Sequence, residues 1–258
     1  MKQARYKGYL IDLDGTLFRG EEVIQEGLAF VQELKNRGLS FLYLTNNSTR
    51  RPEQVAEKLQ KFGYPAHPEQ VVTSAMATAQ VIRRTFDSPP SVYAIGEEGL
   101  IHALTQVGCK MTSDHPDAVV VGLDRGFSYD KMKKAALAIR QGARFFGTNE
   151  DRVLPTEEGL LPGSGSLAMA VAITTGVDPI WIGKPQRPIV EVALKKLDCS
   201  KSEALIVGDN VKTDILAGVN GGIDTLFVTT GVTTLEEYNQ GEISATYVHD
   251  SLALWQFI

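Results

Sequence analysis

Short apolar runs alternate with stretches of helical period along most of this 258-residue chain. The runs "YKGYLIDL", "LSFLYLTNN" and "QVVTS" predict strands, and the stretches between them place their apolar residues on one helical face. The pattern returns late in the chain, in "PIWIGK", "EALIVGD" and "DTLFVTTG". Such alternation is typical of βα units wound around a parallel sheet, so we predict a doubly wound α/β fold.

A middle section has an alternation of its own. The runs "SVYAIG", "AVVVGLD" and "ARFFGTN" predict further strands, with helices expected over 98–107 and 129–141. We interpret this section as a second α/β unit inserted into the first. The predicted core is 1–79 and 180–258, and the predicted insertion is 80–179, with "SPP" as a breaker near its start.

Composition excludes several classes of partner. The formal net charge is −5 and the basic residues are scattered, so the chain lacks the basic patch that nucleic acid or an anionic membrane surface requires. Aspartates interrupt the apolar run near the N-terminus, and no apolar stretch approaches the length of a membrane span. The two cysteines, Cys109 and Cys199, have no metal-type spacing and fit a reducing compartment. The expected location is the cytoplasm.

Polar groups follow four of the predicted strands. They are "DLDGT" (12–16), "TNN" (45–47), "GKP" (183–185) and "GDN" (208–210), the last followed by Asp214. Each of these segments alone is compatible with ordinary turn or capping chemistry. Their joint occurrence favours a ligand site, because ligands of open parallel sheets bind beyond the carboxyl ends of the strands.

These motifs resemble those of the haloacid dehalogenase (HAD) superfamily. "DLDGT", "LTNN", "GKP" and "GDNVKTD" appear in the order expected of its phosphohydrolases. The insertion between the second and third motifs is similar to the large α/β cap of the NagD-like branch, as are "TNEDRVLPTEEGLLPGSGSL" and "GDNVKTDILAGVNGG". The resemblance implies a Rossmann-like HAD core with an inserted cap domain, and a phosphoric monoester hydrolase.

The first motif is expected to carry the chemistry. Asp12 would act as the nucleophile and form an aspartyl-phosphate intermediate, while Asp14 would act as general acid and base. Two carboxylates repel a phosphate dianion unless a cation intervenes, and an oxygen-rich site selects Mg²⁺. In the resembled family the metal is held by the nucleophile, by the backbone carbonyl at the position of Asp14, and by an acid at the position of Asp209.

The other motifs would bind and balance charge. Thr45 and the backbone amide of Asn46 would contact the phosphoryl oxygens, and Lys184 would offset negative charge on the phosphoryl group and the nucleophile. Asn210 and Asp214 would support the metal ligands, or Asp214 would orient Lys184. The alternative for Asp214 is an acid that meets the dipole at a helix start.

The inserted section offers fewer candidates. Asn149 and Asp151 follow one of its strands and could contact the substrate, as cap loops do in the resembled branch; the alternative is an ordinary exposed loop. "PGSGSL" could cradle a phosphate, but we favour N-capping of the apolar run that follows. We assign Thr16 a structural role.

The predicted activity is Mg²⁺-dependent hydrolysis of a small phosphorylated metabolite. Sugar or acid-sugar phosphates are favoured, with nucleotides and aryl phosphates such as 4-nitrophenyl phosphate as further substrate classes. A non-catalytic regulatory or binding module is the alternative from another class. A dehalogenase has no need of a second Asp at position 14, and a phosphomutase would carry its cap between the first two motifs. A homo-oligomer stays open.

Overall fold

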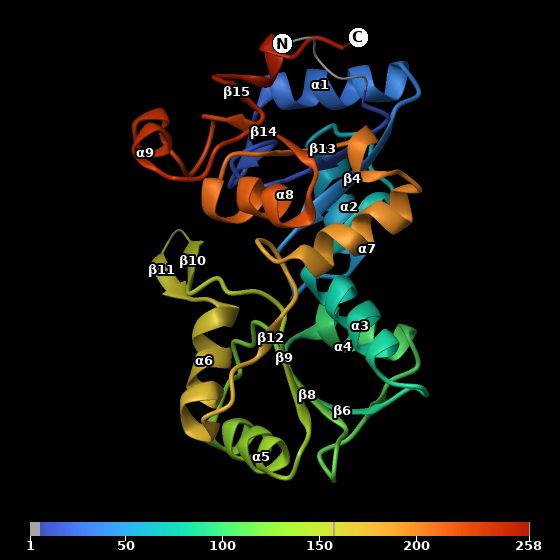
Figure 1. Cartoon of the computed structure of the whole chain (residues 1–258), viewed down its shortest axis with the longest axis vertical. Helices are drawn as coiled ribbons and strands as arrows, with labels where there is room; N and C mark the ends of the chain where they lie inside the picture. The colour runs from blue at the N-terminus through green and yellow to red at the C-terminus, as the bar shows by residue number, and fades with distance from the viewer. Residues whose placement is uncertain (1–5, 157, 258) are drawn as a thin grey trace. The chain divides into compact units, whose positions relative to one another are not determined.

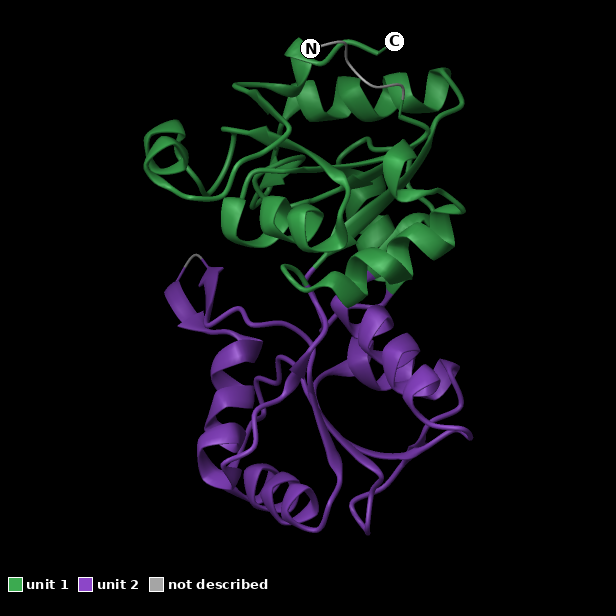
Figure 2. Cartoon of the chain, viewed as in Figure 1, with its two compact units in different colours: residues 1–45, 52–72, 184–258 green, residues 46–51, 73–183 purple. Residues whose placement is uncertain are grey.

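A computed structural model describes residues 6–156 and 158–257 of the chain. They form two compact units, coloured separately in Figure 2. The first unit comprises Met1–Thr45, Pro52–Val72 and Lys184–Ile258, and the second comprises Asn46–Arg51 and Thr73–Gly183. The predicted insertion, 80–179, falls inside the second unit, which extends further at both ends and also takes in the short segment 46–51.

The first unit is built on a six-stranded sheet with β1 and β13 at its centre. The strand order is β15 (Tyr247–His249), β14 (Asp224–Val228), β13 (Ala204–Gly208), β1 (Gly8–Ile11), β4 (Ser40–Thr45) and β5 (Val71–Thr73). β1 pairs in parallel with β4 and with β13, and β14 and β15 continue the parallel pairing. Chain order therefore runs outward in both directions from β1, and the predicted doubly wound fold is confirmed.

Helices cover both faces of this sheet (Figure 1). Tyr9 and Ile11 of β1 belong to a buried cluster that includes the apolar faces of α1 (Gln25–Asn36) and α2 (Pro52–Lys61). On the opposite face α8 (Leu216–Gly221) packs against Ile206 of β13. The unit also contains α7 (Arg187–Leu197), α9 (Leu235–Gln240) and the ribbon of β2 (Phe18–Arg19) and β3 (Glu22–Val23).

The second unit has a parallel sheet of its own. The strand order is β12 (Ile180–Trp181), β9 (Arg144–Gly147), β8 (Ala118–Val121), β6 (Ser91–Ile95) and β7 (Lys110–Met111), and the helices are α3 (Ser74–Thr85), α4 (Glu98–Gln106), α5 (Tyr129–Arg140) and α6 (Ser164–Thr175). The prediction that "PIWIGK" continues the core was wrong, because Ile180 and Trp181 pair with β9. The sheet to which a two-residue strand belongs depends on the strand it pairs with, and the apolar pattern of two residues does not encode that partner.

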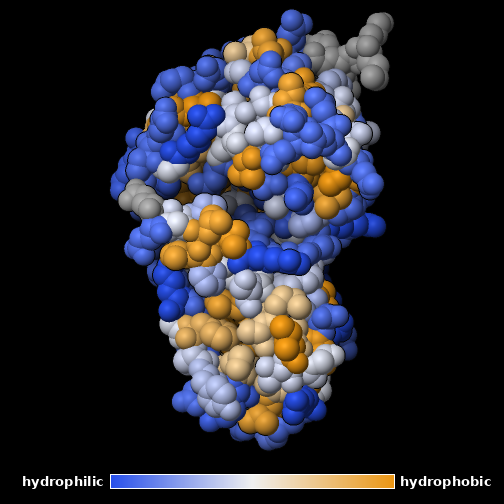
Figure 3. All heavy atoms as spheres, turned by 90° about the vertical axis from the view of Figure 1, so that its left-hand side faces the viewer, coloured by the Kyte–Doolittle hydropathy of each residue, from blue (hydrophilic) through white to orange (hydrophobic). Residues whose placement is uncertain are grey.

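Helix α6 is apolar on nearly all sides, so it lacks the polar face of a surface helix. Ala168 is fully buried, whereas Ile173 is 80% exposed. Figure 3 shows apolar side chains at the surface on the side of the chain that carries α6 and the antiparallel hairpin of β10 (Val153–Thr156) and β11 (Gly159–Pro162). Among the described residues, no helix is long and apolar enough to cross a membrane.

Candidate active site

The two central strands of the first unit end side by side in aspartates. β1 and β13 are paired with Ile11 opposite Val207, and the backbone N–H of Asp12 continues the ladder by donating to the Val207 carbonyl at 2.9 Å. Asp12 and Asp209 therefore leave neighbouring strands at the same edge. This edge is the topological switch point of the sheet, where the chain runs outward in opposite directions and ligands of open α/β sheets bind.

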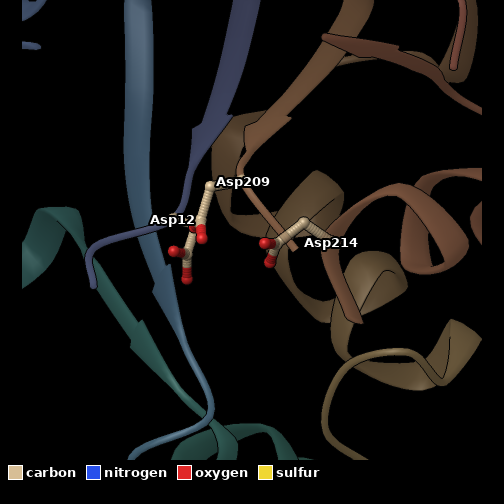
Figure 4. A group of neighbouring side chains, drawn as sticks. All are labelled: Asp12, Asp209 and Asp214. Carbon is tan, nitrogen blue, oxygen red and sulfur yellow. The ribbon is translucent and has the colours of Figure 1, made fainter. Parts of the chain in front are cut away.

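Three carboxylates meet at this point: those of Asp12, Asp209 and Asp214 (Figure 4). One oxygen from each lies within 4.8 Å of the others. Asp12 directly follows β1, Asp209 directly follows β13, and Asp214 lies in the turn after Asp209. Asp12 is 9% exposed and the other two are 1% exposed. Three buried carboxylates at this separation repel one another strongly unless protons or cations neutralise them.

The pKa values of the three acids reflect this environment. Burial raises the pKa of Asp12 to about 7; Lys184 opposes the shift, and the Asp209 carboxylate adds to it. Burial and the neighbouring Asp214 carboxylate raise the pKa of Asp209 to about 6. Burial and the Asp12 carboxylate likewise raise the pKa of Asp214 to about 6. The donor set is all oxygen, which is the chemistry that Mg²⁺ prefers, and a divalent cation would relieve the repulsion.

Lys184 is the buried cation of the site. Its ammonium group donates to Asp12 Oδ1 at 2.5 Å, to Asp214 Oδ1 at 2.6 Å and to the Leu44 carbonyl at 3.2 Å. Burial by itself would lower the pKa of Lys184, but the Asp12 and Asp214 carboxylates outweigh burial and raise it above the ordinary lysine value. The side chain therefore stays charged although it is only 3% exposed.

Asp214 is held by a π-helical turn over Val211–Ile215. While Oδ1 of Asp214 accepts from Lys184, Oδ2 accepts from the backbone N–H of Asn210 at 3.1 Å. The Asn210 side chain accepts from the Lys212 N–H and caps the turn. Both oxygens of Asp214 thus have partners in the chain itself, which fits the predicted alternative that Asp214 orients Lys184.

Thr16 lies between the two strand-end acids, a position that sequence analysis assigned only a structural role. Its hydroxyl donates to Asp209 Oδ1 at 3.1 Å and lies 3.4 Å from Asp12 Oδ2, and the residue is fully buried. The backbone N–H of Val232 donates to the other Asp209 oxygen at 2.6 Å. Thr16 was recognisable as the last residue of "DLDGT", whereas no local pattern pointed to Val232.

The expected phosphate-binding residues lie at the end of β4. Thr45 is its last residue and is 5% exposed, and Asn46, the next residue, is half-buried and begins the segment assigned to the second unit. Asp14 is exposed, in the turn that separates β1 from β2. The predicted roles of Thr45, Asn46 and Asp14 stay predictions.

Within the second unit, Asn149 and Asp151 lie close to Asn46. Asn149 is 3% exposed and donates from Nδ2 to the Asn46 carbonyl at 2.8 Å. The Asp151 carboxylate accepts from Asn46 Nδ2, at 3.1 Å to Oδ2. Ser164 follows Gly163, the N-cap of α6, and its hydroxyl donates to Asn149 Oδ1 rather than capping the helix as expected. Substrate contact by Asn149 and Asp151 stays a prediction.

Comparison with known proteins places this site in a family. Residues 9–110 match the family model described as haloacid dehalogenase-like hydrolase, and residues 181–255 match a second model described as HAD-hydrolase-like. The chain is 51% identical over 250 residues to 5′-nucleotidase YutF of Bacillus subtilis (strain 168), with 97% of each protein covered. The chain belongs to the haloacid dehalogenase-like hydrolase family.

Further relatives of this HAD hydrolase support the same assignment. It is 46% identical over 249 residues to an acid sugar phosphatase of Staphylococcus saprophyticus, covering 96% of this chain and 95% of that protein. A double mutant of thermostable NPPase from Geobacillus stearothermophilus superposes with a TM-score of 0.94 at 46% identity, covering 99% and 100% of the two chains. NagD from E. coli K-12 superposes with a TM-score of 0.92 at 33% identity, covering 98% and 100%. The predicted NagD-like branch and the predicted class, a phosphoric monoester hydrolase, are confirmed.

Proposed function

We propose that this HAD hydrolase is a Mg²⁺-dependent phosphatase that hydrolyses small phosphate monoesters with Asp12 as its nucleophile. The observation that carries the proposal is the contact between Lys184 and Asp12 inside a buried cluster of acids at the switch point. The charged lysine opposes the rise in pKa that burial causes at Asp12, so it favours the ionised carboxylate that a nucleophile needs and fixes its orientation. The phosphatase and nucleotidase names of the relatives support the same reaction class.

The cluster also supports the predicted metal. The Asp12 and Asp209 carboxylates and the Asp14 backbone carbonyl would hold Mg²⁺, and these are hard oxygen donors of the kind the ion prefers. When bound, the ion supplies positive charge that offsets the carboxylates and the phosphoryl group. Asp214 accepts from the Lys184 ammonium group and from the Asn210 N–H, and we assign it to the orientation of Lys184.

The proposed reaction has two steps. The Asp12 carboxylate attacks phosphorus, so a new oxygen–phosphorus bond forms while the bond from phosphorus to the ester oxygen breaks, and the leaving alkoxide takes a proton from Asp14. Asp14 then removes a proton from water, which attacks the aspartyl phosphate and releases inorganic phosphate and free Asp12. The exposure of Asp14 supports its role, because water can reach its carboxylate for the second step, which returns the proton that Asp14 gave up in the first.

The phosphoryl oxygens would be bound by the Thr45 hydroxyl and the Asn46 backbone N–H. Thr45 is the last residue of β4, the strand that pairs with β1, so it lies at the same sheet edge as Asp12, and Asn46 follows it directly in the chain. Lys184 donates to Asp12 and to the Leu44 carbonyl at the end of β4, which supports its predicted charge contact with the phosphoryl group.

For the substrate we favour sugar or acid-sugar phosphates, followed by nucleotides and aryl phosphates. Acid sugar phosphatase, 5′-nucleotidase and NPPase are the names of relatives, and they span these classes. A panel of phosphate esters ranked by kcat/KM tests the preference. The predicted cytoplasmic location and any homo-oligomer stay predictions.

Release of inorganic phosphate from 4-nitrophenyl phosphate, with Mg²⁺ or with EDTA, tests the proposal. Asp12→Asn should abolish turnover, while Asp130→Asn, a matched change on the exposed side of α5, should leave it unchanged. Wild-type turnover in Asp12→Asn would refute the nucleophile, and turnover that survives EDTA would refute the metal. A wild-type protein that releases no phosphate from any ester in the panel would favour the non-catalytic alternative.

A further inference from the structure

The chain passes from one unit to the other at two of the catalytic motifs. It leaves the first unit between Thr45 and Asn46 and returns to it between Gly183 and Lys184. The short segment 46–51 is tied into the second unit along its length, because the Ser48 hydroxyl accepts from the Leu123 N–H at 3.2 Å and the Thr49 carbonyl accepts from the Gly99 N–H at 2.9 Å. Residues of the second unit therefore determine the conformation of the residue that follows Thr45.

Asn46 is held at two points. Its carbonyl accepts two hydrogen bonds, from the Ser74 hydroxyl at 2.6 Å and from Asn149 Nδ2 at 2.8 Å. Its side-chain amide donates to the Asp151 carboxylate. Both lone pairs of the carbonyl are engaged, and the side chain is fixed at its amide end. Asn46 therefore has little freedom to rotate its own backbone N–H.

Asn149 makes the central contact of this network. Besides donating to Asn46, its carboxamide accepts at Oδ1 from the Ser164 hydroxyl at 2.5 Å and from the Asp151 N–H at 3.1 Å. Asn149 and Ser164 are each only 3% exposed. A buried amide with partners on both sides is fixed in orientation, since any rotation would leave a polar group unsatisfied.

The same network reaches the residue before Lys184. Gly183 donates from its N–H to the Thr148 carbonyl at 2.8 Å, and a side chain at Gly183 would come within 2.8 Å of Asn46 Oδ1 and 2.9 Å of Asn149 Cβ. Thr148 and Asn149, directly after β9, thus contact a residue of the second motif and a residue of the third. The close approach explains why this position is a glycine.

We propose that Asn149 is a positioning residue that holds the Asn46 peptide in the conformation that binds the phosphoryl group. Ser164 fixes the Asn149 side chain, and Ser74 holds the Asn46 carbonyl together with Asn149. The inference rests on the proposed function, since it assigns the Asn46 N–H a phosphate to bind. It differs from the predicted substrate contact, because the Asn149 amide is turned into the network and is engaged there on both sides.

A pair of substitutions at Asn149 separates positioning from packing. Asn149→Asp keeps the shape and the acceptor for Ser164 but removes the donor to Asn46, whereas Asn149→Ala removes both. Each should raise KM for 4-nitrophenyl phosphate and the dissociation constant of inorganic phosphate about 10-fold, because a small misplacement of a binding group weakens contact with the ligand. Phosphate binding is measured by calorimetry on the Mg²⁺-loaded full chain, independently of turnover.

Further variants provide the controls. Ser74→Ala removes the other donor to the same carbonyl and should weaken phosphate binding in the same direction. Ser166, in the first turn of α6 like Ser164, donates its hydroxyl to the Arg152 carbonyl and has no part in the network, so Ser166→Ala should leave phosphate binding unchanged. Melting temperatures are recorded for every variant, and binding is compared well below the lowest of them.

The outcomes separate this inference from the proposed function. A wild-type protein that turns over esters, with phosphate affinity unchanged in Asn149→Asp and Ser74→Ala, would overturn the positioning role alone. A wild-type protein that neither turns over esters nor binds phosphate would overturn both. A fall in melting temperature without a change in phosphate affinity would show that Asn149 acts only in folding, and would also refute the positioning role.

Discussion

Lys184 Nζ lies 2.5 Å from Asp12 Oδ1, and both side chains are almost wholly buried. The lysine reaches Asp12 from the segment just before α7, whereas Asp12 comes from the end of β1. A pair of this kind costs a large desolvation free energy for each ion, so removing one partner is more damaging than the attraction between the two would suggest.

Lys184→Met should therefore reduce both activity and stability. The variant leaves Asp12 and Asp214 buried without their cation, and we expect unfolding free energy at pH 8 to fall by about 3 kcal/mol. Turnover should fall by about 1,000-fold, since a buried charge beside the reacting group is lost. Denaturant titration and phosphate release measure the two effects. Lys133→Met, on the surface of α5, is the matched control, and equal losses in both variants would contradict the prediction.

Stability of the metal-free protein should decrease with rising pH. The pKa values of Asp12, Asp209 and Asp214 are raised from 3.8 to about 7, 6 and 6. A carboxyl whose pKa is higher in the folded chain stabilises the fold fully below its unfolded pKa, and this contribution is lost as pH rises through the folded value. Melting temperature in EDTA should therefore fall between about pH 4 and pH 7 relative to the protein with saturating Mg²⁺.

Asp214→Asn provides the internal comparison for this pH dependence. It removes one of the three titrating groups and one source of repulsion on Asp12, so the slope of melting temperature against pH in EDTA should become shallower. A wild-type profile that is flat in EDTA, or that Mg²⁺ does not change, would contradict the account of the acid cluster.

Thr16→Val should weaken metal binding with little change in shape. The hydroxyl that donates to Asp209 Oδ1 at 3.1 Å is lost, while a side chain of nearly the same volume remains. We expect the Mg²⁺ concentration for half-maximal turnover to rise about 10-fold, as when other hydrogen bonds to metal ligands are removed. Thr16→Ser, which keeps the hydroxyl, should restore most of the affinity. Equal Mg²⁺ dependence in the two variants would show that the hydroxyl is irrelevant.

Gly231→Ala should displace Asp209. A Cβ at Gly231 would lie 1.9 Å from Asp209 Oδ2, so either the acid or the loop must move. The N–H of the next residue, Val232, donates to the same oxygen, and this contact would be disturbed as well. We expect a higher Mg²⁺ concentration for half-maximal turnover and a lower melting temperature. Gly241→Ala, where the nearest atom is 3.4 Å away, should be close to wild type in both measurements.

The pairing of Asp12 with Asp209 could be predicted because it depends on two local patterns and one rule of topology. Each acid directly follows a buried apolar run, and the carboxyl ends of parallel strands meet at one edge of their sheet. The resemblance of the motifs to the HAD family then identified which polar residues at that edge carry the chemistry. None of these steps needed the packing of a particular side chain.

Other features of the site required the tertiary structure. Local sequence did not indicate that Ile180 and Trp181 pair with β9, that Val232 donates to Asp209, or that Asn149 is buried against Asn46. Each is a contact between segments far apart in the chain, and a short polar or apolar segment is compatible with several partners. Sequence determined which residue types stand at the strand ends, and only the folded chain decided which buried polar group satisfies which, because that choice depends on long-range packing.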